Sequence, residues 1–165
     1  MMSRNNNVVG RRGFDRKWLF ILLVLLIVAA LIMYAVQVIT APNWSFKVVT
    51  DKTVYKLGEN ITITAVLKNN GYITHSFKAY YEDPIEVTIG KGTFPFGVWY
   101  SSNQKNIHDV SIPPGQTIER TVVWNQTDRD GKLVEPGIYT IRAEILDGEK
   151  WLPIFEAEIS ITITE

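Results

Sequence analysis

The chain has 165 residues, no cysteine, and 17 basic residues balanced by 17 acidic ones. Without cysteine, neither disulfide bonds nor a lipid-modified cysteine can support or anchor the protein. Five basic residues and one acidic residue lie in the first 17 positions, which leaves 12 basic and 16 acidic residues in the rest. That mildly acidic remainder offers no basic footprint for nucleic acid.

Residues 1–17 form a basic segment that precedes a long apolar stretch. No charged residue occurs between Lys17 and Lys47, and residues 18–39 are long enough for a helix of about 33 Å, which matches a bilayer core of about 30 Å. Arg11, Arg12, Arg16 and Lys17 set the orientation by the positive-inside rule. We therefore expect one transmembrane helix, with the amino terminus in the cytoplasm and the carboxyl-terminal domain outside the cell membrane.

A cleaved signal peptide is the alternative for this stretch. Its apolar part is longer than the 7 to 15 residues or so that are typical of secretory signals. Cleavage after Ala41 would place Ile39 three positions back and Pro42 directly after the cut, and both disfavour processing. The sequence therefore favours an uncleaved anchor.

Residues 40–52 read as a juxtamembrane segment with a first strand, and residues 53–165 as one extracytoplasmic domain. Apolar and polar residues alternate most clearly over residues 61–67, 139–145 and 155–164, a period that a half-buried strand explains. Weaker strand candidates, rich in β-branched and aromatic residues, are 46–50, 76–81, 85–89, 98–101 and 117–124.

Turn residues separate these strands at short intervals, and Gly58 precedes one of them where a positive φ is cheap only for glycine. Trp99 and Trp124 are expected to fill the space between two sheets. Seven to nine short strands without a helical period predict an all-β fold, an antiparallel immunoglobulin-like β-sandwich preceded by one transmembrane α-helix.

Several motifs occur in a suggestive order along the outer domain. They are Tyr55-Lys56-Leu57-Gly58-Glu59, Leu67-Lys68-Asn69-Asn70-Gly71, Gly97-Val98-Trp99-Tyr100, Ile112-Pro113-Pro114-Gly115 and Glu135-Pro136-Gly137-Ile138-Tyr139. Over residues 53–145 this order resembles the BsuPI-type domain of the intracellular proteinase inhibitor family. The resemblance implies an antiparallel β-sandwich and protein binding.

An aromatic run lies at residues 94–100, beside a predicted loop. Not all of its side chains can point inward, and aromatic residues are enriched at the cores of protein interfaces. Phe94, Phe96, Trp99 and Tyr100 are therefore the expected partner contacts.

The sequence lacks the residue constellations of an enzyme. His75 and His108 have no co-ligand at metal-binding spacing, and Asp128 to Gly131 matches a hairpin turn better than a calcium loop. Ser101 or Ser102 could be drawn as a catalytic triad with His108 and Asp109, but neither serine lies in the strained turn that a nucleophile of this kind needs. We expect no catalysis, no cofactor and no metal.

Three asparagines fit the N-glycosylation acceptor pattern on the side of the membrane that we expect to be outside: Asn43, Asn60 and Asn125. The pattern permits modification without requiring it.

Together these observations predict a non-enzymatic, single-pass membrane protein whose outer β-sandwich binds a protein partner. The alternatives are an accessory subunit of a larger membrane or envelope complex, such as an archaeal surface or filament assembly or an oxidoreductase, and an extracytoplasmic protease inhibitor. An inhibitor would insert an exposed loop, for instance residues 90–95 or 102–108, into a protease cleft. The partner's identity and the oligomeric state stay open.

Overall fold

The computed structural model describes residues 16–92, 97–101 and 104–165, and the chain divides into two compact units between residues 39 and 40. The first unit contains α1 (Arg16–Thr40), a helix of 25 residues without an acidic residue in its first turn. Within the described residues it is the one helix long and apolar enough to cross a membrane. The predicted apolar helix is thus confirmed, and it is consistent with a membrane anchor or a signal sequence.

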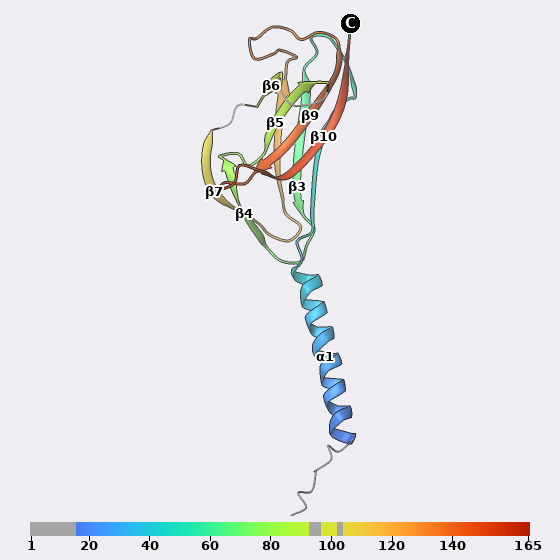
Figure 1. The fold of residues 1–165 in the computed structure, drawn as a ribbon. Helices are drawn as coiled ribbons and strands as arrows, with labels where there is room; N and C mark the ends of the chain where they lie inside the picture. The colour runs from blue at the N-terminus through green and yellow to red at the C-terminus, as the bar shows by residue number, and fades with distance from the viewer. Residues whose placement is uncertain (1–15, 93–96, 102–103) are drawn as a thin grey trace, which may run out of the picture. The chain divides into compact units, whose positions relative to one another are not determined.

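The second unit is a β-sandwich with ten strands in its described part (Figure 1). The strands are β1 (Trp44–Thr50), β2 (Val54–Lys56), β3 (Ile61–Asn69), β4 (His75–Tyr81), β5 (Glu86–Lys91), β6 (Trp99–Tyr100), β7 (Lys105–Ile112), β8 (Thr117–Trp124), β9 (Gly137–Leu146) and β10 (Pro153–Thr164).

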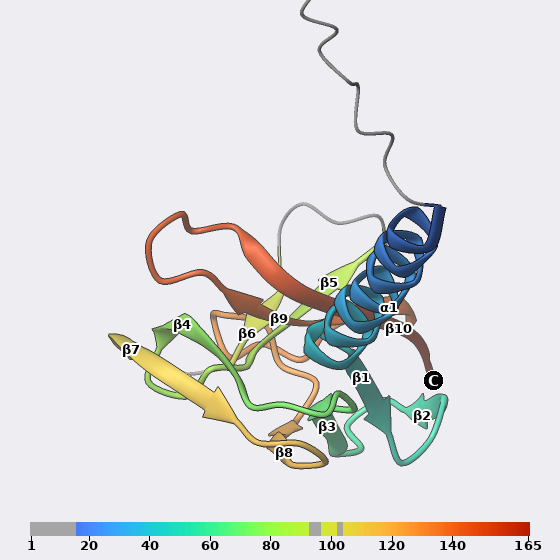
Figure 2. The ribbon, with the colours of Figure 1, turned by 90° about the horizontal axis from the view of Figure 1, so that it is seen from below.

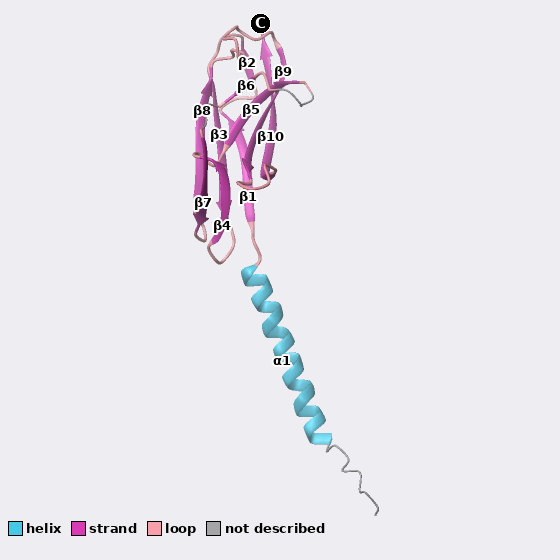
Figure 3. Cartoon of the chain, turned by 60° about the vertical axis from the view of Figure 1, so that its left-hand side comes forward, coloured by secondary structure: helices cyan, strands magenta, loops and turns pink. Residues whose placement is uncertain are grey.

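Two sheets form the sandwich. One has the order β1-β3-β8 and the other β2-β10-β9-β5-β6, and Figure 3 shows β3 and β8 on one side of the domain with β9 and β10 on the other. Strands β4 and β7 make a separate antiparallel pair and lie side by side in Figure 2. The predicted immunoglobulin-like β-sandwich is confirmed.

The core lies where the inward residues of both sheets meet. In β3 and β9 alternate residues are buried, as the sequence pattern predicts, and Ile61, Ile63, Ile141 and Ala143 are fully buried. Trp124 of β8 is also fully buried, and its ring centroid lies 5.5 Å from that of Tyr139. These contacts across the sandwich replace the disulfide that many small outer domains use.

The chain changes sheets early. β1 pairs with β3, and after residues 51–53 the chain continues as β2, which pairs in parallel with Thr162–Thr164 of β10. The expectation of purely antiparallel sheets was wrong at this point, because three residues of parallel pairing leave no periodicity in the sequence. Since β1 belongs to the sandwich, the domain begins before residue 53.

Strands β2 and β7 lie outside the predicted strand candidates. β2 has three residues, and in β7 burial alternates only from His108 to Ile112, so neither strand is long enough to show a clear period in the sequence. The expectation of an exposed loop over residues 102–108 was therefore wrong from Lys105 onward, where the chain forms β7.

Candidate functional site

The predicted contact patch is only partly described. Phe94 and Phe96 lie outside the described residues. Trp99 is half-buried and packs against the core, whereas the neighbouring Tyr100 is 42% exposed. The guanidinium carbon of Arg129 lies 4.1 Å from the centroid of the Tyr100 ring, and the Tyr100 hydroxyl accepts a hydrogen bond from the Gly97 amide. Tyr100 is thus already in contact with the domain's own residues.

A larger exposed aromatic residue lies in the turn between β9 and β10. Trp151 is 59% exposed and the following Leu152 is 62% exposed. Asp147 closes this turn, since its amide donates to the Leu152 carbonyl and its carbonyl accepts from the Trp151 amide. This site was not predicted from the sequence, although two large apolar residues next to an Asp-Gly turn are a visible signal.

The Trp151 backbone has a φ of 58°, in the left-handed region. Hairpin turns of this kind normally place glycine at such a position, and asparagine also tolerates it. The turn before it is firmly held, because Oδ1 of Asp147 accepts hydrogen bonds from the Glu149 and Lys150 amides. Those two bonds lower the pKa of the Asp147 carboxyl.

The Trp151 ring lies on residues of the β4–β7 pair. Its centroid is 4.4 Å from that of Tyr80, which is 7% exposed, and the Lys105 ammonium lies 5.1 Å from both centroids. Packing on Tyr80 covers one part of the indole and leaves the rest in solvent. We call Tyr80, Lys105, Ile107, Trp151 and Leu152 the Trp151 surface.

Ile107 of β7 joins this surface beside Gly148. A Cβ on Gly148 would lie 2.8 Å from the Ile107 side chain and 3.2 Å from the Ala79 carbonyl, so the turn sits directly on the β4–β7 pair. The Gly148 amide donates to the Lys78 carbonyl, which fixes the turn there. Ile107 is 45% exposed. The two elements therefore bring three exposed apolar side chains to one part of the domain: Ile107, Trp151 and Leu152.

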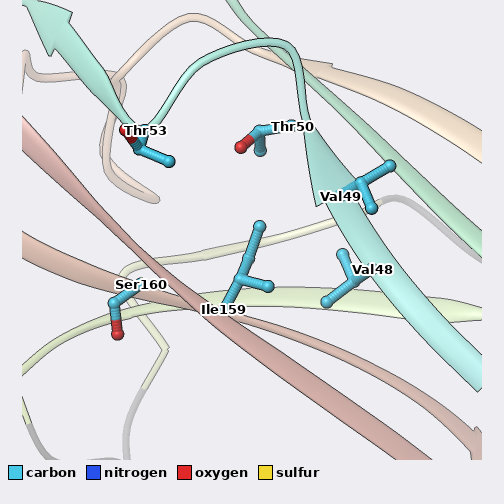
Figure 4. A pocket seen from close by; sticks show the side chains of 6 residues that line it. All are labelled: Val48, Val49, Thr50, Thr53, Ile159 and Ser160. Atoms are coloured by element: carbon cyan, nitrogen blue, oxygen red, sulfur yellow. The ribbon is translucent and has the colours of Figure 1, made fainter.

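A groove of about 410 Å³ lies between β1 and β10 (Figure 4). Ile159 and Val48 point toward one another across it, whereas Ser160 points away. Its remaining lining residues are Val49, Thr50 and Thr53, close to the point where the chain changes sheets. None of the described residues that line the groove is charged, which suits apolar side chains rather than an ionic ligand.

A second hollow, of about 310 Å³, is lined by both charged and apolar side chains. The Lys91 ammonium lies 2.8 Å from the Glu135 carboxylate at its rim, and this hydrogen bond raises the pKa of Lys91 and lowers that of Glu135. Oδ1 of Asp128 accepts from the Asp130 and Lys132 amides, as in an ordinary turn. Lys91, Asp128 and Glu135 are therefore already hydrogen-bonded to the domain's own residues.

The residues considered for catalysis do not come together. Oγ of Ser101 is buried and accepts a hydrogen bond from the Val87 amide, and Ser102 lies outside the described residues. His108 and Asp109 are consecutive in β7 and so point to opposite faces. Within the described part of the chain, no three His, Cys, Asp or Glu side chains form a group that could hold a metal ion.

The three possible glycosylation sites are all exposed. Asn43 precedes β1, Asn60 precedes β3, and Asn125 follows β8. The Asn125 side-chain oxygen accepts a hydrogen bond from the Thr127 hydroxyl, the other residue of its acceptor motif. Glycosylation at these positions stays a prediction from the sequence.

No family model and no curated protein matches the chain. Among solved structures, it is similar to the CARDB domain of a Pyrococcus furiosus protein, solved in complex with di-metal ions (15% identity, TM-score 0.44, 76% of this chain and 90% of that one). It is also similar to β-glucosidases from Erythrobacter marinus (17%, 0.45) and Listeria innocua (15%, 0.43). The match covers 74–75% of this chain and 16% of each glucosidase, so nothing about their ligands carries over.

Proposed function

We propose that this protein is a non-enzymatic, single-pass membrane protein whose β-sandwich binds a protein partner outside the cell. The single observation that carries the proposal is the Trp151 surface. Tryptophan is enriched among the residues that dominate binding energy at protein interfaces. Here it occupies a backbone conformation that normally favours glycine, and it remains 59% exposed.

The apolar helix supports the anchoring part of the proposal. Its 25 residues would extend about 37 Å, enough to cross a bilayer with some tilt. Arg16 and Lys17 lie at its first turn, and no basic residue lies in its last turn. This asymmetry favours a cytoplasmic amino terminus. A tethered domain meets membrane partners at a raised effective concentration.

Labelling of introduced cysteines tests the topology, because the chain has no cysteine of its own. In intact cells a membrane-impermeant maleimide should label the Glu165→Cys protein and leave the Ser3→Cys protein unlabelled until the cells are opened. The reverse pattern would refute the orientation. Loss of residues 1–41 from the mature protein would refute the anchor.

Three finer proposals go beyond protein binding: a role as an accessory subunit, protease inhibition, and membership of the BsuPI-type family. An accessory subunit of a membrane or envelope complex fits the Trp151 surface best, because a permanent partner would cover the exposed apolar side chains. Protease inhibition and membership of the BsuPI-type family rest on the sequence resemblance. A panel of serine proteases assayed with the purified protein separates inhibition from the other two.

Partner capture with matched variants tests the proposed function. The full-length protein should be extracted gently from its native host, crosslinked, and its bound proteins quantified by mass spectrometry. Trp151→Asn tolerates the positive φ and should lose a partner that the wild-type protein retains. Tyr72→Ala removes another highly exposed aromatic side chain, 74% exposed, and should retain it. Equal recovery with both variants would refute the Trp151 surface as the contact.

A further inference from the structure

Strand β10 is paired along one side and mostly unpaired along the other. On one side β9 pairs with it from Pro153 to Ile163. On the other side β2 pairs only with Thr162–Thr164, and within the described residues no other strand pairs there. Residues 155–161 therefore form an open edge about 23 Å long, at roughly 3.3 Å per residue.

The hydrogen bonds to β2 show which residues face this open edge. The Thr162 amide donates to the Thr53 carbonyl, and the Thr164 carbonyl accepts from the Leu57 amide. Backbone groups alternate in direction along a strand, and the register with β9 is unbroken from Phe155 to Ile163. The amides and carbonyls of Glu156, Glu158 and Ser160 therefore point to the same side as those of Thr162.

The inward side chains of β10 differ in solvent exposure along the strand. Ile161 and Ile163, beside β2, are each 1% exposed. Phe155, Ala157 and Ile159, along the open edge, also pack against the core but are only half-buried. All five side chains are on the inward face of β10. We attribute their different burial to β2, which pairs only with Thr162–Thr164 and leaves residues 155–161 without a neighbouring strand on that side.

Strand β1 completes the apolar lining of this open side. Trp44 and Phe46 are also half-buried, and the Phe155 ring centroid lies 5.4 Å from that of Trp44 and 6.2 Å from that of Phe46. Farther along, Ile159 and Val48 face one another across the groove (Figure 4). A strand laid along β10 would place every second side chain over this apolar row.

The outward face of the open edge is acidic and therefore favours an incoming strand with basic side chains. Glu156 and Glu158 lie there with one basic neighbour, Arg142, which contacts them at 3.6 and 2.5 Å. Glu144 lies directly across from Glu156 on β9. Two copies of this chain paired edge to edge would bring the glutamates of both strands together, and like charges opposite one another destabilise a sheet.

We propose that the open edge of β10 binds an extended segment of a different protein, with apolar side chains alternating with basic ones. The apolar side chains would fill the groove between β1 and β10, and the basic ones would face Glu156 and Glu158. This surface is separate from the Trp151 surface and does not depend on it.

A synthetic peptide tests the proposal directly. The probe is a fluorescent seven-residue peptide of alternating lysine and valine, titrated against the full-length protein in nanodiscs of zwitterionic lipid. We expect saturable binding, at least about tenfold tighter than that of a glutamate–valine peptide. No binding up to millimolar protein would overturn the proposal, and equal binding of the acidic peptide would overturn the basic requirement.

A matched pair of variants tests the hydrogen bonds. Ser160→Pro removes an amide that faces the open edge and leaves the ladder with β9 intact, whereas Ser160→Ala keeps the amide. We expect the proline variant to bind at least about tenfold more weakly, the worth of roughly one hydrogen bond, and the alanine variant to bind like wild type. Equal binding by the two would overturn strand addition.

Modified peptides give a test that leaves the protein untouched. One peptide is N-methylated at every lysine and another at every valine, so one of the two must lose the amides that face β10. Strand addition predicts that this peptide alone fails to bind, and retention of binding by both would overturn it. The alternative occupant of the open edge is a second copy of this chain. Sedimentation of wild type and Ser160→Pro tests it, because self-association that the proline abolishes would show that a second copy binds here and would overturn a different protein as the occupant.

Discussion

Two residues of this domain share one unusual backbone conformation and differ in everything else. Gln126 has a φ of 59° and Trp151 a φ of 58°. Gln126 is fully buried, and its side chain accepts a hydrogen bond from the Gly58 amide and donates one to the Lys56 carbonyl. Trp151 is mostly exposed. Two long-range side-chain hydrogen bonds hold Gln126 in this conformation, whereas the Trp151 ring packs on Tyr80 and stays largely in solvent.

This difference separates a structural role from a binding role. Gln126 links the loop after β8 to the turn after β2. The Gly58 amide that it binds in that turn is 68 residues away in the chain. No comparable link requires a tryptophan at position 151, because the turn is closed by backbone groups and by Asp147. Substitutions at Gln126, Asp147 and Trp151 test this separation, and one at Glu144 tests the effect of burial on a charge.

Gln126→Ala should have the largest effect on stability. It removes the side-chain hydrogen bonds to the Gly58 amide and the Lys56 carbonyl, although that carbonyl keeps the Glu59 amide as a donor, and it does not relieve the positive φ. We expect the free energy of unfolding to fall by about 1–3 kcal/mol, at about 0.5–1.5 kcal/mol for each of the two hydrogen bonds. Chemical denaturation of the full-length protein in detergent measures it. A loss comparable to that of an exposed substitution such as Tyr72→Ala would contradict the structural role.

Asp147→Ala should have the next largest effect, because it removes both side-chain bonds that hold the turn before Trp151. We expect the melting temperature to fall by a few degrees. The wild-type carboxyl has a lowered pKa, so its contribution is present above its unfolded pKa and is lost as the pH falls through the folded value. The gap between wild type and Asp147→Ala should therefore narrow in acid, and a constant gap would contradict this account.

Trp151→Asn should change stability little. It loses the contacts with Tyr80 and Lys105, but asparagine is among the residues that best tolerate the left-handed conformation. We expect the free energy of unfolding to stay within about 1 kcal/mol of wild type. A loss as large as that of Gln126→Ala would mean that Trp151, like Gln126, serves the fold.

Glu144→Gln should have the smallest effect and the opposite sign. Burial raises the pKa of the Glu144 carboxyl, which means that its charged form is less stable in the folded protein. Its unfavourable contribution is present above the folded pKa and disappears as the pH falls below the unfolded value. The variant should therefore melt slightly higher than wild type at pH 7 and equally in acid. A lower melting temperature at pH 7 would contradict the burial effect.

Much of the fold was predictable from local pattern. The predicted strand at residues 117–124 coincides with β8, and the other candidates fall on strands of the structure with small shifts at their ends. Alternation is a reliable signal when one face is buried along the whole strand. β7 escaped prediction because most of its residues are exposed, and β2 because three residues are too few for a period.

The candidate sites were less predictable. Residues 94–100 were the predicted contact because aromatic residues are dense there, but Trp99 packs against the core and Tyr100 lies against Arg129. Trp151 was overlooked because two apolar residues beside an Asp-Gly turn are a signal too short to show a period. Its importance depends on its φ and on contacts with Tyr80 and Lys105, both far from it in sequence.

The sequence by itself determined an apolar helix followed by a disulfide-free β-sandwich, because apolar length, strand alternation and cysteine content are local properties. Only the tertiary structure decided which strands become neighbours. The parallel pairing of β2 stops at Thr162, and this leaves the amides of Glu158 and Ser160 on an open edge beside half-buried apolar side chains. Such an edge depends on pairing between residues about 100 positions apart, which no local pattern encodes.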